Sequence, residues 1–165
     1  MDTSPSSPIR PPIHLDEFWA YQVVVLADQV SRHTLGVVRS EANLNQSQWR
    51  VLAAVADKPG RSSAEVTAVT PMDKTLVSRA VASLIKSGLI KRTPSLEDKR
   101  MSALEMTELG AQRYALIAEK LSSTLTLPDI DGHSTKDFNT AVKDFSRYMA
   151  RLSADLKADA RDSSA

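Results

Sequence analysis

Residues 70–108 determine the fold, and they read TPMDKTLVSRAVASLIKSGLIKRTPSLEDKRMSALEMTE. Apolar residues recur through the first half of this stretch at spacings of three and four, which predicts a helix with one broad apolar face. Gly88 follows as a typical helix-ending residue, and a strand, a charged hairpin tip and a second strand come after it. The apolar positions of the predicted helix are Leu76, Val77, Ala80, Val81, Leu84 and Ile85.

The opposite face of this predicted helix is short, polar and cationic. Side chains of this kind can reach base edges and phosphates in a DNA groove. The predicted hairpin is basic as well, so helix and hairpin together indicate DNA binding. The polar positions are Lys74, Thr75, Ser78 and Arg79 on the helix and Lys91, Arg92, Lys99 and Arg100 on the hairpin.

This stretch resembles the winged helix of the multiple-antibiotic-resistance regulator (MarR) family. One likeness is the predicted recognition helix, DKTLVSRAVASL at 73–84, which runs into KSGLIKR at 86–92. A second is the hairpin tip at 97–100, where Asp98 and Arg100 match the family's Asp-x-Arg signature. A third is Met-Thr-Glu-Leu-Gly at 106–110, which is close to the family's Leu-Thr-Glu-Lys-Gly and departs from it at Met106 and Leu109. Together with residues 44–57, the resemblance covers about half of the chain.

The resemblance implies a mostly α-helical winged helix-turn-helix with a two-stranded wing and with dimerisation helices at both ends. The first two turns of the recognition helix would enter the major groove, where Arg79 is the best candidate for a bidentate guanine contact. In the wing, Arg100 would enter the minor groove with Asp98 orienting it, and Arg92 and Lys99 would contact phosphates. The alternatives are a solvated helix face and a hairpin-tip salt bridge.

Helix signals surround the winged helix. Residues 15–40 and 46–57 read as helices, and Asn45 with Gln48 has the spacing of a capping box. A second capping box at 62–65 starts a short helix to about residue 69, so helix, turn and helix follow one another. Thr107 and Ser134 are predicted to cap two further helices.

The two terminal helices carry apolar side chains that their own segments cannot bury. The first has a stripe at Leu15, Trp19, Val23, Leu26, Val30 and Val37, with His33 beside it as a candidate buried histidine. The last has apolar residues that alternate spacings of four and three, which is the pattern of a coiled-coil seam. The two helices could cover each other, a second subunit could cover them, or both. We expect both, and therefore a homodimer. The seam residues are Phe138, Val142, Phe145, Met149, Leu152 and Leu156.

We therefore divide the chain into a flexible N-terminal arm (1–13), a dimerisation helix (14–40), the winged helix-turn-helix (41–108), C-terminal dimerisation helices (109–158) and a tail (159–165). The arm holds four prolines and three serines, which predicts a disordered tail or an arm that packs on a partner subunit.

Charge distribution supports nucleic-acid binding although total charge does not. The formal net charge is +1, whereas residues 72–100 hold seven basic and three acidic side chains, a net +4. A localised positive surface is what phosphate binding requires. The chain has no cysteine, which excludes disulfides. It also lacks an apolar run of membrane-spanning length and a signal-peptide pattern, so we expect a cytoplasmic protein without membrane contact.

Sequence patterns for catalysis and for metal binding are lacking. There is no glycine-rich phosphate loop or nucleophile elbow, and the three histidines form no metal-binding pair. We expect no enzymatic activity, no metal and no cofactor. Two other classes stay open: a winged helix that docks protein without specific DNA binding, and an enzyme whose site has no motif.

A small-molecule effector is implied by the resemblance alone. Members of the family bind aromatic acids or related thioesters between the dimerising helices and the winged helix, and an aromatic wall with a cation suits an aromatic carboxylate. The chain thus reads as a ligand-responsive regulator, expected to be a repressor that binds a double-stranded, pseudo-palindromic operator as a homodimer. The candidate effector residues are His14, Trp19, Arg32, His33, Trp49 and Arg50, although core packing is the alternative for both tryptophans.

Overall fold

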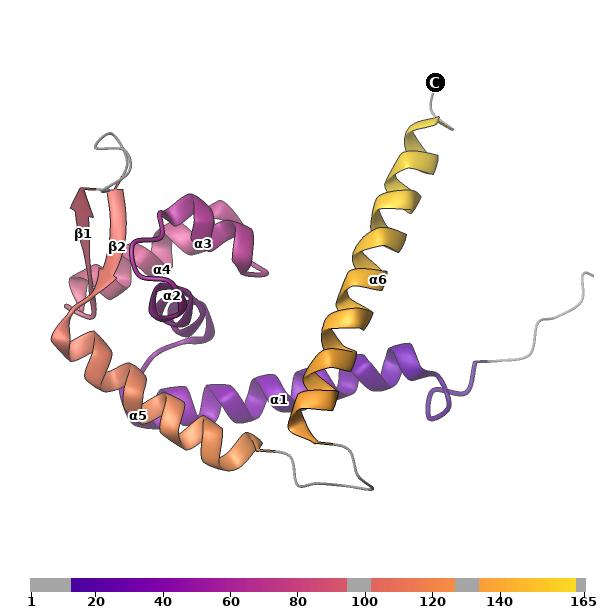
Figure 1. Cartoon of the computed structure of the whole chain (residues 1–165), viewed down its shortest axis with the longest axis horizontal. Helices are drawn as coiled ribbons and strands as arrows, with labels where there is room; N and C mark the ends of the chain where they lie inside the picture. Colours follow the sequence, from indigo (N-terminus) through magenta and orange to yellow (C-terminus); the bar gives the residue numbers. More distant parts are fainter. Residues whose placement is uncertain (1–12, 95–101, 127–133, 163–165) are drawn as a thin grey trace, which may run out of the picture. The chain divides into compact units, whose positions relative to one another are not determined.

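The computed structural model describes residues 13–94, 102–126 and 134–162, so the predicted N-terminal arm lies almost wholly outside the described residues. The chain is mostly helical with one two-stranded antiparallel sheet, which confirms the predicted fold class (Figure 1). It forms two compact units, Met1–Leu121 and Ser122–Ala165. The elements are α1 (Trp19–Ala42), α2 (Gln46–Asp57), α3 (Ser63–Val69), α4 (Lys74–Lys86), β1 (Ile90–Pro94), β2 (Ser102–Met106), α5 (Glu108–Leu125) and α6 (Thr135–Asp162).

The hydrophobic core lies among α2, α3, α4 and the hairpin, and α5 contributes Ile117 to it. In the first unit these elements gather around fully buried side chains, whereas α1 runs away from them and buries only Val37 and Val38 near its C-terminal end (Figure 1). The core thus holds the helix-turn-helix and the wing together as one body. Its largest fully buried members are Leu52, Leu84, Ile90, Leu104 and Ile117.

Three helices begin at side-chain caps, and the sequence predicts the first two of these caps. Asn45 and Gln48 bond reciprocally at the start of α2, with the Gln48 amide donating to the Asn45 side chain at 2.9 Å. Ser62 and Glu65 form the second capping box, at the start of α3. Asp73 caps α4 by accepting a hydrogen bond from the Leu76 amide at 2.8 Å. Capping fixes where each helix starts, because it satisfies amides that have no partner inside the helix.

The end of α4, the wing and the start of α5 meet at one junction. Gly88 has φ +70°, a conformation that favours glycine, and it lets the Leu89 amide bond back to the Leu84 carbonyl oxygen at 2.9 Å. The Thr107 hydroxyl donates to the Gly88 carbonyl oxygen at 2.6 Å and accepts from the Gly110 amide at 3.0 Å. Thr107 is therefore the cap of α5, as predicted, and it also holds the turn that ends α4.

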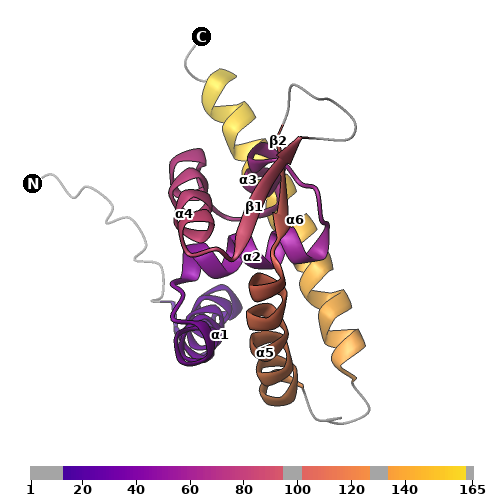
Figure 2. The same cartoon turned by 90° about the vertical axis from the view of Figure 1, so that its left-hand side faces the viewer.

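The wing is an antiparallel hairpin in which Ile90 pairs with Met106 and Pro94 with Ser102. Figure 2 shows β1 and β2 side by side, with α5 continuing from β2. The other edge of β2 is also used, because Leu104 exchanges backbone hydrogen bonds with Gly60 at 3.0 Å and with Arg61 at 2.8 Å. The loop after α2 thus fixes the base of the wing.

The burial predicted for two side chains, Leu76 and His33, is wrong. On α4, Leu76 is 42% exposed, because it lies at the edge of the apolar arc rather than at its centre. On α1, which begins at Trp19 rather than at residue 15, His33 and most of the predicted stripe are exposed. The reason is that α2 reaches only the C-terminal part of α1. The seam of α6 is exposed in the single chain, and its cover by the first helix, by a second subunit or by both stays a prediction. No helix within the described residues is long and apolar enough to cross a membrane.

Gly110→Ala should destabilise the protein by about 1–3 kcal/mol, because a Cβ would lie 1.9 Å from the Leu89 carbonyl oxygen and the junction would have to move apart. The sign is diagnostic, since alanine is normally more stable than glycine in a helix by about 1 kcal/mol. Gly36→Ala on α1 is the matched control, because nothing lies within 4 Å of its added Cβ, and it should stabilise the protein. Urea unfolding measures both variants, and a stabilised Gly110→Ala protein would contradict the junction.

Candidate nucleic-acid interface

Helix α4 divides sharply into a buried side and an exposed side. Val77, Ala80, Val81 and Leu84 lie against the core, each with 5% or less of its surface exposed. Positions four, three and four residues apart line the other side, and all four of them are exposed. They are Thr75, Arg79, Ala82 and Lys86.

The four predicted DNA-reading residues of the helix are all solvent-exposed. Thr75 and Arg79 lie at the centre of the exposed side of α4, and Lys74 and Ser78 lie along one flank. None of the four forms a side-chain hydrogen bond or ion pair with another described residue. Their donors and acceptors are therefore available to an external ligand without breaking an internal interaction.

The opposite flank of α4 is held by α2. The Gln48 side chain donates to the Ser83 hydroxyl at 2.7 Å, while its backbone and side chain also form the cap of α2. One glutamine thus connects the start of α2 to the last turn of α4. This contact fixes the rotation of the recognition helix about its own axis, and so which residues it presents.

The wing presents its two described cations differently. Lys91 forms an ion pair across the hairpin with Glu105 at 3.4 Å, and Thr93 donates to the same carboxylate at 3.1 Å. Arg92 points to the other face of the strand and donates to the Ser102 hydroxyl at 3.4 Å, a neutral partner. Because the Lys91–Glu105 pair is solvent-exposed, it is weak and screened by salt, yet it lowers the local positive charge beside Lys91. Arg92 is therefore the stronger phosphate candidate.

The remaining wing candidates, Asp98, Lys99 and Arg100, lie in residues 95–101, outside the described residues. The two strands that carry this tip are described and end at Pro94 and Ser102.

Helix α3, which sets the position of α4, is anchored by its cap. The Glu65 carboxylate accepts from the Ser62 amide at 2.8 Å and from the Ser62 hydroxyl at 2.9 Å. These two bonds, the backbone one most, hold the pKa of Glu65 below its usual value, and nearby Lys58 and Arg61 act in the same direction. A lowered folded-state pKa means that this stabilisation is present at neutral pH and is lost as the pH falls through that folded-state value.

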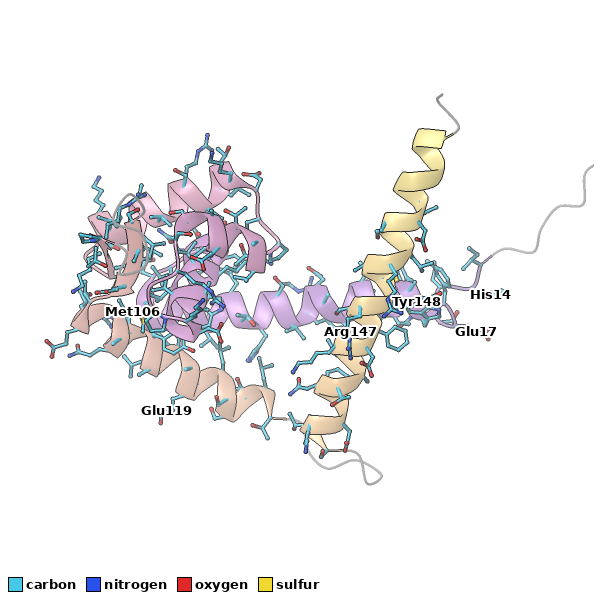
Figure 3. The ribbon with its side chains drawn as sticks, turned by 45° about the horizontal axis from the view of Figure 1, so that its top comes forward. His14, Glu17, Met106, Glu119, Arg147 and Tyr148 are labelled. Atoms are coloured by element: carbon cyan, nitrogen blue, oxygen red, sulfur yellow. The ribbon has the colours of Figure 1, made fainter. Side chains whose placement is uncertain are left out.

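The six candidate effector residues lie on two helices and on the segment before the first of them. His14 precedes α1 (Figure 3), and Trp19 is the first residue of α1. Arg32 and His33 follow some 13 residues later, which is about 20 Å along a helix. Within one chain, these two pairs of residues are therefore too far apart to form one compact site. Arg32 forms an ion pair with Asp28 on the exposed surface of α1.

Trp49 and Arg50 are half-buried on α2, and Trp49 has a partner that the sequence did not reveal. Its ring stacks on that of Tyr114 from α5, with centroids 5.7 Å apart and planes at 20°. No spacing rule connects residues 65 positions apart, so only an aromatic residue on the inner side of α5 could have hinted at it. The described residues contain no group of three His, Asp or Glu side chains that could hold a metal ion.

Comparison with known proteins finds similarity to transcription regulators. Residues 42–101 match the model of the MarR family. The uncharacterized HTH-type transcriptional regulator YybA of Bacillus subtilis (strain 168) is 26% identical over 77 residues, which are 47% of this chain and 51% of that protein. The chain thus spans about half the length of this curated relative.

Solved structures share the fold. A MarR family transcriptional regulator from Silicibacter pomeroyi DSS superposes with a TM-score of 0.70 at 20% identity, covering 88% of this chain and 96% of that one. The transcriptional repressor CouR bound to a 23-mer DNA duplex gives 0.60 at 22% identity, covering 85% and 99%. CouR from Rhodococcus jostii RHA1 bound to p-coumaroyl-CoA gives 0.65 at 17%, covering 86% and 95%.

Ser62→Ala should raise the pKa of Glu65 toward its usual value, because one of its two donors is lost, and should destabilise the protein by about 1 kcal/mol through loss of the cap. Carboxyl-carbon NMR titration and urea unfolding measure the two effects. Ser134→Ala is the control, since Ser134 lowers the pKa of Asp137 at the start of α6 in the same way and should leave Glu65 unchanged. A Glu65 pKa that does not move in the Ser62 variant would contradict this account.

Proposed function

We propose that this chain, whose residues 42–101 match the model of the MarR family, is a transcription regulator of that family. It would be a repressor that binds a pseudo-palindromic DNA operator as a homodimer and is released by a small ligand. The observation that carries the proposal is the exposed side of α4, where Thr75 and Arg79 are solvent-exposed with no partner among the described residues while the other side is buried in the core. Such a helix offers its N-terminal turns to the major groove without rearrangement.

Each candidate side chain has a role that its chemistry suits. Arg79 is the guanine reader, because its planar guanidinium can donate two parallel hydrogen bonds. Thr75, Ser78 and Lys74 contact base edges and phosphates beside it. In the wing, Arg92 and Lys99 contact phosphates, and Arg100 enters the minor groove with Asp98 as its orienting partner. The roles of the tip residues rest on their match to the family motif.

A homodimer is supported by apolar side chains that are solvent-exposed in the described structure. The seam of α6 exposes six of them in one stripe, and α1 exposes several along most of its length. A face of this size in water points to a protein interface. We assign the dimer contacts to residues 14–40 and 109–158. A two-fold dimer presents two recognition helices related by symmetry, which is why the operator should be pseudo-palindromic.

A ligand that contains an aromatic acid or its thioester is supported by chemistry rather than by a formed site. CouR binds p-coumaroyl-CoA in one solved structure, and here the Trp49–Tyr114 stack lies next to Arg50 in sequence. Aromatic faces and a cation suit a flat anionic compound. Arg32 and His33 on α1 and His14 and Trp19 at its start would complete such a site only if a second subunit brings them to it.

Arg79→Ala should relax sequence preference, because loss of a bidentate guanine contact removes about 1–3 kcal/mol of base discrimination. Lys86→Ala is the matched control. It lies on the same exposed side two turns later, and it should weaken binding to all sequences alike and lower the salt slope by about 1. Operator and random duplexes are compared in binding assays over a range of salt concentrations. Equal losses on both duplexes for Arg79→Ala would remove its base-reading role, and no DNA binding by the wild type would favour a protein-docking winged helix.

Met149→Asp combined with Leu152→Asp should convert the dimer into monomers, because each charge buried in an apolar interface costs several kcal/mol. Ala154→Asp introduces the same charge on the opposite side of α6, where Ala154 is exposed, and should leave the dimer intact. Sedimentation velocity at micromolar concentration distinguishes the species. A monomeric wild type, or a double variant that stays dimeric, would refute the α6 interface.

A further inference from the structure

Leu76 is the one large apolar side chain that is exposed on α4, all of whose residues the structure describes. It is 42% exposed, whereas Val77, Val81 and Leu84 are almost completely buried. The core of the winged helix is therefore complete without it. A single exposed leucine needs no explanation by itself. What distinguishes Leu76 is its place in the first turn of the helix that presents Thr75 and Arg79 to DNA.

The backbone at Leu76 is held firmly. Its amide donates to the Asp73 carboxylate at 2.8 Å, the bond that caps α4. Two turns further along the same flank, Ser83 is occupied by Gln48, so the flank is closed toward the C-terminal end and open at Leu76. A side chain on a capped first turn loses little backbone freedom when it meets a ligand.

In the major groove, the apolar group on a base edge is the C5-methyl of thymine. We propose that Leu76 packs on the C5-methyl of a thymine close to the guanine that Arg79 reads. This contact favours thymine over the other bases at that position. Leu76 and Arg79 are three residues apart on one helix, so their Cβ atoms are about 5–6 Å apart. With about 3.4 Å between successive bases of one strand, the two bases lie within two steps of each other. This inference rests on the proposed DNA-binding function.

Deoxyuridine tests the contact, because uracil differs from thymine only by the missing methyl group and keeps every hydrogen bond. An operator is first selected from random duplexes with the wild-type protein, and each thymine is then replaced by deoxyuridine in turn. At one thymine per half-site, the replacement should weaken wild-type binding about fourfold per subunit, the value expected for burying one methyl group. The same replacement should leave binding of Leu76→Ala unchanged, because the partner of the methyl group is already absent.

Leu109→Ala is the matched control, since Leu109 is a leucine of similar exposure, 45%, on α5. It should keep the wild-type penalty at the sensitive thymine. Melting temperatures of both variants exclude a folding effect, and the ratio of thymine to uracil affinities does not depend on the fraction of active protein. Equal penalties for the wild type and Leu76→Ala at every thymine, or no sensitive thymine at all, would overturn the contact alone. A selection that enriches no sequence would overturn the proposed function, and the contact with it.

Discussion

The burial of one side of α4 is the constraint on which the rest of the structure depends. Val77, Ala80, Val81 and Leu84 are fixed against the core by packing, and a helix has no freedom to rotate while four of its side chains are enclosed. The residues on the opposite side are therefore presented at fixed angles. Base reading requires donors placed to within a fraction of an ångström, so the same apolar contacts that stabilise the fold also determine which side chains can reach DNA.

A few contacts at one junction fix the position of the wing relative to α4. Gly88 reverses the chain, Thr107 bonds to its carbonyl oxygen, and Gly110 allows α5 to approach Leu89 directly. Because a side chain at position 110 would collide with backbone rather than with a flexible group, little adjustment is available there. The hairpin is secured on its other edge by the Leu104 bonds to residues 60 and 61. Backbone geometry therefore sets the position of the described strands of the wing relative to α4.

Local features were predictable from the sequence, and features that join distant segments were not. The caps at Asn45 and Ser62 were correct because a cap involves residues three apart. The predicted burial of Leu76 was wrong because periodicity counts both edges of an apolar arc alike, whereas only packing shows which edge is covered. The Trp49–Tyr114 stack could not be predicted because it depends on how α2 and α5 pack. Lys91 was counted among the basic positions of the hairpin, and its ion pair with Glu105 could not be predicted because only the hairpin register reveals that partner.

The charge distribution links DNA binding to assembly. Each winged helix offers few described cations without an acidic partner, chiefly Lys74, Arg79, Lys86 and Arg92, while Lys91 is offset by Glu105. Non-specific affinity grows with the number of phosphates neutralised, so one copy gains little from electrostatics. In the proposed dimer, two such surfaces are joined, and binding of the second becomes intramolecular with a large effective concentration. The exposed apolar faces of α1 and α6 would then be a condition of DNA binding, because they join the two copies. A ligand that alters the spacing of the two copies would remove the gain in effective concentration without touching any base contact.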